Sequence, residues 1–448
     1  MEKKLSGKEY VFIGSLLFGL FFGAGNLIFP VQMGQLSGAD MLPATLGFLT
    51  TAVGLPFLGI VAMGMSRKDS LYELASKVSP GYSMFYTCAL YLTIGPFFAI
   101  PRTATVSFES AFAPYLPANQ LQLVLLIFSA LFFGSSLWFS LKPTEILKWV
   151  GKVLNPIFLV SVAILIAFGM FNPMGEVATI PVAEAYQQQG SFFKGFLEGY
   201  NTMDALASLA FGIIIVSTIK NLGVTKPASI AKDTIISGIF SMSLMGIIYA
   251  SLVYLGATSR GIIEVSPNGG VALADISRHY FGGLGGIVLA VIITVACYKT
   301  AVGLITAISE MFVTLFPNKL TYNHYVYVFT AISFIVANLG LNQIIAFSIP
   351  VLMFLYPLAI TLIVVTILSP LFKDKMIVYQ MTTIFTLPFA LIDFLHALPK
   401  GLKSSIGLDQ LSIWAKGFIP LFSVGMGWLI PAIIGFIIGL VLTKRKTK

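Results

Sequence analysis

Charged residues are scarce in this chain. Only 10% of its 448 residues are Asp, Glu, Lys or Arg, whereas a soluble globular domain carries about a quarter. Hydrophobic residues make up 57% of the chain, and the mean hydropathy is +0.91. Such a composition excludes a surface that faces water on all sides. We therefore expect an α-helical integral membrane protein.

Cysteine and histidine are also rare, with two and three residues. Cys88 and Cys297 both lie in apolar runs, which favours plain packing over a disulfide framework. The histidines, His279, His324 and His396, fall at or near the ends of apolar runs. No metal-ligand spacing, Ser/His/Asp arrangement or phosphate-binding glycine loop stands out. We expect neither an enzyme nor a bound cofactor.

The net charge of +9 does not indicate a nucleic-acid partner, because the basic residues are scattered through short loops. No polar stretch is long enough to fold as a separate soluble domain. Residues 1–448 are therefore expected to form one membrane domain in contact with the lipid bilayer. No obligate protein partner is evident.

Apolar runs between turn and charge signals predict twelve membrane-spanning helices. They lie near 10–33, 41–65, 82–113, 121–141, 147–172, 195–219, 230–256, 283–315, 322–339, 341–369, 376–397 and 414–442. Two basic residues, Arg102 and Lys299, fall within spans. Of the other Lys and Arg residues, only a few lie on the side away from the N-terminus: Lys194, Arg260, Arg278, Lys400, Lys403 and Lys416. Because inner loops collect Lys and Arg, both termini are expected to be cytoplasmic.

The first span contains a helix-weakening segment, FGLFFGAGNLIFP, at 18–30. Glycines at 19, 23 and 25 are followed by Asn26 and Pro30. A break within the bilayer persists only where the backbone is buried in protein or lines a cavity. There its free amides and carbonyls can bind ions and charged groups. Close helix packing through small residues is the alternative.

The sixth span reads YNTMDALASLAFG at 200–212 and places Asp204 inside an apolar helix. A carboxylate within the membrane is costly and usually functional. The alternative is that Asp204 lies near the outer interface and caps the helix that follows it.

Spans one and six begin two halves of five helices each, near 10–172 and 195–369, and two peripheral helices follow near 376–442. An odd number of spans per half forces the second half to be inverted. Paired breaks in inverted repeats indicate the central site of a secondary transporter. Span three carries Arg102 and Glu109 on one helix face, and span eight carries Lys299 and Glu310 on one face, in the mirrored placement that inverted repeats predict. Chance is the alternative. A channel would leave the two breaks without a role.

The sequence resembles the branched-chain amino acid:cation symporters, the BrnQ-type carriers of leucine, isoleucine and valine. The resemblance covers essentially the whole chain and rests on FFGAGNLIFP (21–30), YLTIGPFFAIPRTATVSFE (91–109), GYNTMDALASLAFGIIIV (199–216), TAVGL (300–304) and VANLGL (336–341). It implies a leucine-transporter-type fold, with ten core helices in two inverted repeats. It also implies sodium-coupled uptake across a bacterial inner membrane.

In that fold, the unwound parts of spans one and six hold the charged groups of the substrate. The resemblance assigns this role to Gly23, Ala24, Gly25, Asn26, Asp204, Ala205 and Ser208. Free amides at helix N-termini would bind the carboxylate, and carbonyls at helix C-termini the ammonium. An apolar pocket would hold the side chain.

The sodium site implied by the resemblance lies between carbonyls of span one and the Thr300 hydroxyl. Lys299 departs from the family pattern, since a neutral residue is expected there. Its ammonium could replace sodium as a tethered cation, which would make the carrier proton-coupled or uncoupled. It could instead point aside toward a carboxylate or the interface.

Two further features of the sequence carry open alternatives. Arg102 and Glu109 are interpreted either as a buried ion pair or as part of an extracellular gate. Pro350 is expected to interrupt span ten. The alternative there is an ordinary proline kink.

Overall fold

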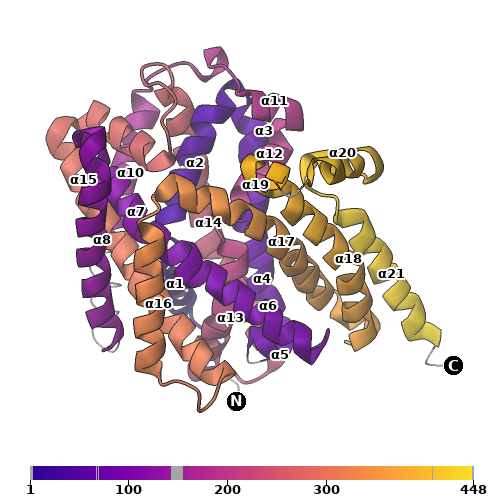
Figure 1. Cartoon of the computed structure of the whole chain (residues 1–448). Helices are drawn as coiled ribbons and strands as arrows, with labels where there is room; N and C mark the ends of the chain where they lie inside the picture. The colour runs from indigo at the N-terminus through magenta and orange to yellow at the C-terminus, as the bar shows by residue number, and fades with distance from the viewer. Residues whose placement is uncertain (1–3, 67, 69, 143–154, 406, 446–448) are drawn as a thin grey trace.

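The computed structural model describes residues 4–445 except 67, 69, 143–154 and 406. Every regular element in these residues is a helix and none is a strand, which confirms the predicted all-α fold. The long helices stand side by side in one bundle, and the two ends of the chain lie toward the same, lower side in Figure 1. The N-terminal part of the fifth predicted span, 147–154, lies outside the described residues. So do several basic residues expected on the inner side: Lys3, Arg67, Lys148, Lys152, Lys446 and Lys448.

The first half of the chain forms the helices up to α10. They are α1 (Gly7–Phe21), α2 (Ala24–Ser37), α3 (Met41–Leu49), α4 (Leu55–Ser66), α5 (Leu71–Ala75), α6 (Pro80–Leu92), α7 (Ala99–Ala111), α8 (Ala118–Ser140) and α10 (Asn155–Phe171). Short π-helical turns at Thr50–Gly54 and Thr93–Phe97 join α3 to α4 and α6 to α7. Spans two and three of the sequence analysis are therefore each built from two helices.

The second half forms the helices from α11 onward. They are α11 (Glu184–Gln189), α12 (Ser191–Tyr200), α13 (Asp204–Asn221), α14 (Pro227–Ser259), α15 (Gly269–Leu315), α16 (Tyr322–Ala337), α17 (Leu341–Ile367), α18 (Met376–Ala397), α19 (Lys400–Ser405), α20 (Asp409–Phe418) and α21 (Leu429–Arg445). Helix α15 bends at Gly282, whose φ of 64° suits glycine. The bend coincides with the predicted start of span eight.

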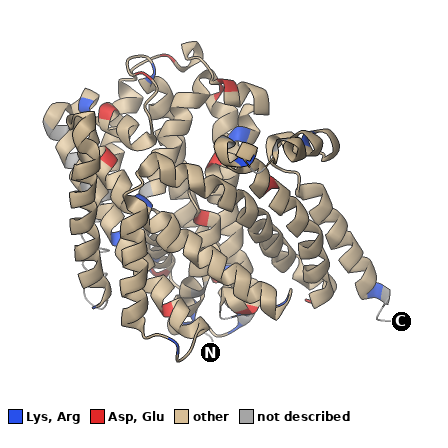
Figure 2. Cartoon of the chain, in the orientation of Figure 1, with Lys and Arg blue, Asp and Glu red and all other residues tan. Residues whose placement is uncertain are grey.

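By length and composition, eight helices among the described residues can cross a membrane. The count of twelve spans stays a prediction. Figure 2 shows that most Lys, Arg, Asp and Glu residues lie toward the two ends of the bundle, with few in its middle. This distribution suits a protein whose middle zone faces hydrocarbon.

Two predictions for the C-terminal part, the interruption at Pro350 and the start of the last span, are wrong. Helix α17 runs through Pro350 and Pro357 without a break, so the alternative of a tolerated proline holds. Neighbouring helices pack against this helix and sustain it. The last span begins at Leu429, because positive φ angles at Leu421 and Gly425 turn the chain between α20 and α21.

The broken helices pack reciprocally on the second helices of the opposite halves. Helix α14 runs along α1 and α2, while α12 and α13 run along α3 and α4. Glycines allow the backbones to meet. A Cβ added at Gly34 would lie 2.1 Å from the Val253 carbonyl oxygen, and one at Gly47 would lie 1.9 Å from that of Phe192. An inverted repeat requires such reciprocity, although the repeat itself stays a prediction.

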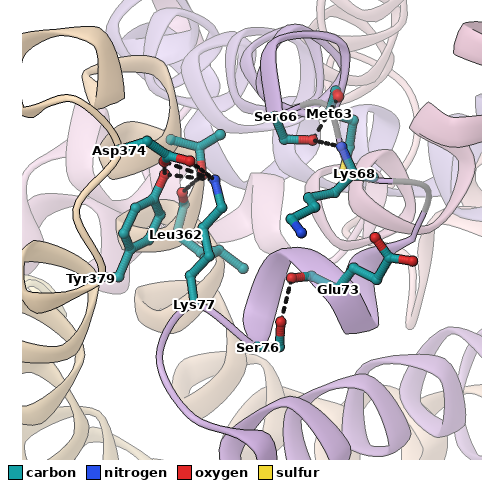
Figure 3. A network of polar contacts seen from close by, with 10 residues as sticks. Met63, Ser66, Lys68, Glu73, Ser76, Lys77, Leu362, Asp374 and Tyr379 are labelled. Carbon is teal, nitrogen blue, oxygen red and sulfur yellow. Dashed lines mark hydrogen bonds and ion pairs between the residues drawn. The ribbon is translucent and has the colours of Figure 1, made fainter.

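A buried lysine ties the peripheral helix α18 to the first half of the chain (Figure 3). Lys77 lies in the turn between α5 and α6, and its side chain is only 5% exposed. Its Nζ lies 2.8 Å and 2.9 Å from the two carboxylate oxygens of Asp374 and donates to the Tyr379 hydroxyl at 3.3 Å. The Tyr379 hydroxyl also donates to Asp374 at 2.9 Å. The network compensates a cation that would be costly to bury alone.

We expect Asp374→Asn to lower the free energy of unfolding by about 1–3 kcal/mol, since it leaves the buried Lys77 without its counter-charge. Asparagine tolerates the left-handed backbone of this position, where φ is 56°. Thermal unfolding of the purified protein in detergent checks this, with Glu176→Gln as the control at an exposed carboxylate. Equal unfolding midpoints for both variants would contradict a stabilising role of the network.

Candidate functional site

The first helix break lies at Phe22 and Gly23, between α1 and α2. Phe22 is extended, with φ −74° and ψ 101°, and Gly23 is extended too. The Gly23 amide donates to the side-chain oxygen of Asn26 at 2.8 Å. Asn26 therefore satisfies an amide that the break removes from the helical pattern. The interruption predicted for span one is confirmed.

The second break covers residues 201–203, between α12 and α13. Met203 has a left-handed backbone, with φ 63° and ψ 9°. The Asp204 amide, which opens α13, donates to the Thr202 hydroxyl at 3.3 Å. The interruption predicted for span six is likewise confirmed.

A buried cluster of hydrogen bonds joins the two breaks. The Asn26 amide nitrogen donates to Asp204 Oδ2 at 2.7 Å and also contacts the Tyr249 hydroxyl. That hydroxyl donates to the same carboxylate oxygen at 2.9 Å. Asn26, Asp204 and Tyr249 are 3%, 2% and 0% exposed. Segments that lie 178 residues apart in sequence thus share one polar centre inside the bundle.

Two cations contact the carbonyl ends of the broken helices. The Arg102 guanidinium on α7 donates to the Asn201 carbonyl, at the end of α12, at 2.6 Å. The Lys299 ammonium on α15 donates to the Gly19 carbonyl, in the last turn of α1, at 3.1 Å. A cation at a helix C-terminus is favourable, since the carbonyls there lack helical partners. Arg102 also donates to the Ser348 hydroxyl at 3.3 Å and stacks on the Phe29 ring.

A cavity of about 50 Å³ lies at the junction of the two breaks. Since a water needs about 10–15 Å³, the cavity has room for a few water molecules. One part of its wall is polar, and the other is apolar. The wall comprises Leu20, Phe21, Gly23, Gly25, Asn26, Ile94, Ala99, Arg102, Thr103, Thr202, Met203, Asp204, Ala207, Phe211, Thr300 and Leu304.

The structure brings only part of the predicted substrate set into this wall. Gly23, Gly25, Asn26 and Asp204 line the cavity, whereas Ala205 and Ser208 do not. Ser208 faces α4, where its hydroxyl would lie 1.9 Å from a Cβ added at Gly59. Ser208 lies on the same helix face as Asp204, one turn further along, but at that level α4 packs against the face and takes the place of the cavity. The side chain of Ala24 lies outside the described residues.

The predicted cation residues occupy different places. Thr300 lines the cavity and packs on Gly23, where an added Cβ would lie 3.2 Å from its methyl group and 3.3 Å from its hydroxyl. Lys299 lies outside the cavity wall, at the Gly19 carbonyl.

Arg102 and Glu109 do not form the predicted ion pair within the described part of the chain. The Glu109 side chain lies near Asn268 and Gly270, where α15 begins. Although both residues lie on α7, each turns to a different partner.

Sequence reasoning missed Tyr249, which lies in the middle of α14. Nothing in its apolar surroundings marks it, since an aromatic residue in a membrane span is ordinary. Only the reciprocal packing of α14 on the first broken helix brings its hydroxyl to Asp204. Thr202 was not predicted either, although it lies in the segment where the second break was expected.

Comparisons with known proteins agree over the full chain. The family model described as "Branched-chain amino acid transport protein" matches residues 6–446. The branched-chain amino acid permease BrnQ of Lactobacillus delbrueckii subsp. lactis is 47% identical, over 99% of this chain and 100% of that protein. The branched-chain amino acid permease BraB of Bacillus subtilis (strain 168) is 43% identical, over 99% and 97%.

Two solved structures share the fold. MhsT in complex with L-phenylalanine has a TM-score of 0.57 at 16% identity, covering 98% of this chain and 99% of its own. The inward-facing conformation of Mhp1 has a TM-score of 0.63 at 15% identity, covering 98% and 91%. Both have the predicted leucine-transporter-type fold, which is thereby confirmed.

Gly23→Ala tests the close approach of the first break to α15. The extended backbone at Gly23 accepts alanine, so the effect is steric, and we expect a loss of about 1 kcal/mol in unfolding free energy. Thr300→Ser removes the methyl group that the new Cβ would meet, so the double variant should recover part of the loss. Thermal unfolding of both variants and of Thr300→Ser alone measures the recovery. Strictly additive losses would contradict the contact.

Proposed function

Since this chain belongs to the family of branched-chain amino acid transport proteins, we propose that it takes up leucine, isoleucine and valine by cation-coupled alternating access. The observation that carries the proposal is the Asn26–Asp204 hydrogen bond across two helix breaks. It provides a polar centre for a zwitterion in an otherwise apolar bundle. In this proposal the protein lies in a bacterial cytoplasmic membrane, with both termini cytoplasmic.

The cavity offers complementary groups for both ends of an amino acid. Free amides at the start of α2 and the Arg102 guanidinium suit a carboxylate. Asp204 and the carbonyls of the last turn of α1 suit an ammonium.

Arg102 also has the position of a gate, because its hydrogen bond to the Asn201 carbonyl joins α7 to the second break. Release of that contact would free α12 to move.

The apolar part of the wall suits a branched aliphatic side chain. Phe21, Ile94, Phe211 and Leu304 form it, together with Leu20. An apolar pocket distinguishes one methylene by only about 1–3 kcal/mol. Overlapping use of leucine, isoleucine and valine therefore follows from the chemistry of this wall.

Sodium is the first candidate for the coupling ion. Thr300 packs against the first break, so its hydroxyl oxygen and the carbonyls at the end of α1 are the groups that would bind it. Sodium prefers oxygen ligands of this neutral kind, and the Thr300 hydroxyl already donates its proton to the Ala296 carbonyl at 3.1 Å. The oxygen lone pairs are thus directed away from that bond.

A second candidate rests on the contact of Lys299 with the Gly19 carbonyl. The ammonium already provides a positive charge at the end of α1, where a bound cation would act. Such a tethered cation makes the carrier proton-coupled or uncoupled. In either candidate the cation holds α1 against α15.

Substrate binding is tested by uptake of radiolabelled leucine into proteoliposomes. We expect Asn26→Ala and Asp204→Asn to lower uptake at least tenfold, since each variant disrupts the buried cluster of hydrogen bonds that joins the two helix breaks. Ser208→Ala is the matched control, because Ser208 lies on the same helix as Asp204 but outside the cavity, and its uptake should stay near normal. Normal uptake by both Asn26→Ala and Asp204→Asn would show that the site is misplaced. No uptake by the unaltered protein under sodium or proton gradients would overturn the function.

The coupling ion is tested in the same proteoliposomes by replacing sodium with choline. The first candidate predicts that sodium raises leucine uptake and that Thr300→Val, which removes only the hydroxyl, abolishes the increase. The second predicts equal uptake in sodium and choline and a loss in Lys299→Met, which keeps the length of the side chain without its charge. Sodium-dependent uptake that survives Thr300→Val would contradict the proposed sodium ligand.

A further inference from the structure

A second cavity, of about 180 Å³, lies between α12, α17, α18 and the turn that follows α20. We call it the peripheral cavity. One side of its wall is apolar and includes Leu197, Leu352 and Met353. Since a water needs about 10–15 Å³, the cavity has room for more than a single ion. Its mixed wall, apolar with a few polar groups, is that of a site for a small organic molecule.

The wall contains a buried carboxylate, that of Asp393. Asp393 on α18 is 2% exposed, and its Oδ2 has no hydrogen-bond partner among the described residues. The Tyr200 hydroxyl, which belongs to the same wall, is also buried and unsatisfied in that part of the chain. A buried unpaired charge is costly, so a carboxylate in this place indicates a cationic group that the described residues do not supply.

Two basic residues, Lys194 and His396, lie in this wall, and neither is bonded to Asp393 Oδ2 in the described part of the chain. Lys194 on α12 lies 2.8 Å from Glu198, which also accepts a hydrogen bond from the Asn201 side chain at 2.9 Å. These three residues form a compensated group in the cavity wall, on the side of α12. Asp393 comes from a different helix and belongs to none of these contacts.

We propose that the peripheral cavity is a second binding site for an amino acid, with the ammonium on Asp393 and the aliphatic side chain against Leu197, Leu352 and Met353. The inference rests on the proposed function for its substrate class. A bare sodium ion suits the cavity less well, because it would leave the apolar side of the wall, with Leu197, Leu352 and Met353, without a contact. The ammonium and the aliphatic side chain of an amino acid match the carboxylate and the apolar side of this wall.

Asn201 connects this site with the central one. This residue lines the peripheral cavity, and its backbone carbonyl accepts the hydrogen bond from Arg102, which lines the central cavity. An amino acid in the peripheral cavity would therefore contact the segment that Arg102 fastens. The two sites share the break between α12 and α13.

Equilibrium binding of radiolabelled leucine to the full-length protein in detergent tests the inference. We expect two leucines per chain for the unaltered protein and one for Asp393→Asn, with Glu264→Gln, at an exposed carboxylate, as the control. Leu197→Trp fills the peripheral cavity without changing Asp393 and should also remove one leucine. Size-exclusion profiles establish that both variants fold. The same assay with radiolabelled sodium shows which cation Asp393 binds.

One leucine per chain in the unaltered protein, unchanged by Asp393→Asn, would overturn the second site while leaving the proposed function intact. No bound leucine in any variant would instead overturn the proposed function. Loss of bound sodium, with leucine binding unchanged, would overturn the assignment of the cation as an amino-acid ammonium.

Discussion

The arrangement of this bundle depends on satisfying the backbone groups that two broken helices leave without helical partners. Within a bilayer no water is available to replace lost helical hydrogen bonds, so each freed group needs a partner from the protein. Asn26 accepts from the Gly23 amide, and Thr202 accepts from the Asp204 amide. Lys299 and Arg102 donate to carbonyls at the ends of α1 and α12.

The partners of the broken ends follow the predicted symmetry of the chain. Arg102 belongs to span three and holds the end of the broken helix in the second half. Lys299 belongs to span eight, the corresponding helix of the other half, and holds the broken helix in the first. Each half therefore supplies the cation that stabilises the break of the other. This exchange explains why two basic residues persist inside an apolar bundle, where an isolated ammonium or guanidinium is costly.

The sequence predicts the site residues well where placing a residue in a membrane helix costs much free energy. Glycines around Asn26 and a carboxylate at 204 are expensive in a lipid-facing helix, so both breaks could be predicted. Pro350 has the same signature, yet α17 stays continuous, because packing against neighbouring helices decides whether a proline interrupts a helix. Tyr249 is an ordinary residue for a membrane helix, so the sequence does not single it out. Only the packing of α14 on α2 brings its hydroxyl to Asp204.

Buried charges in this protein differ in what their surroundings provide. Lys77 is fully matched, since both oxygens of Asp374 and the Tyr379 hydroxyl surround its ammonium. Such a group has little to gain from a solute, and its role is to fasten the peripheral helix α18. At the breaks, Arg102 and Lys299 donate to backbone carbonyls, which carry only partial charges. In the proposed function, a zwitterion or a proton would alter these contacts, which hold the helices that would move. The difference between carboxylate and carbonyl partners thus separates charges that stabilise the fold from charges that are suited to respond to a substrate.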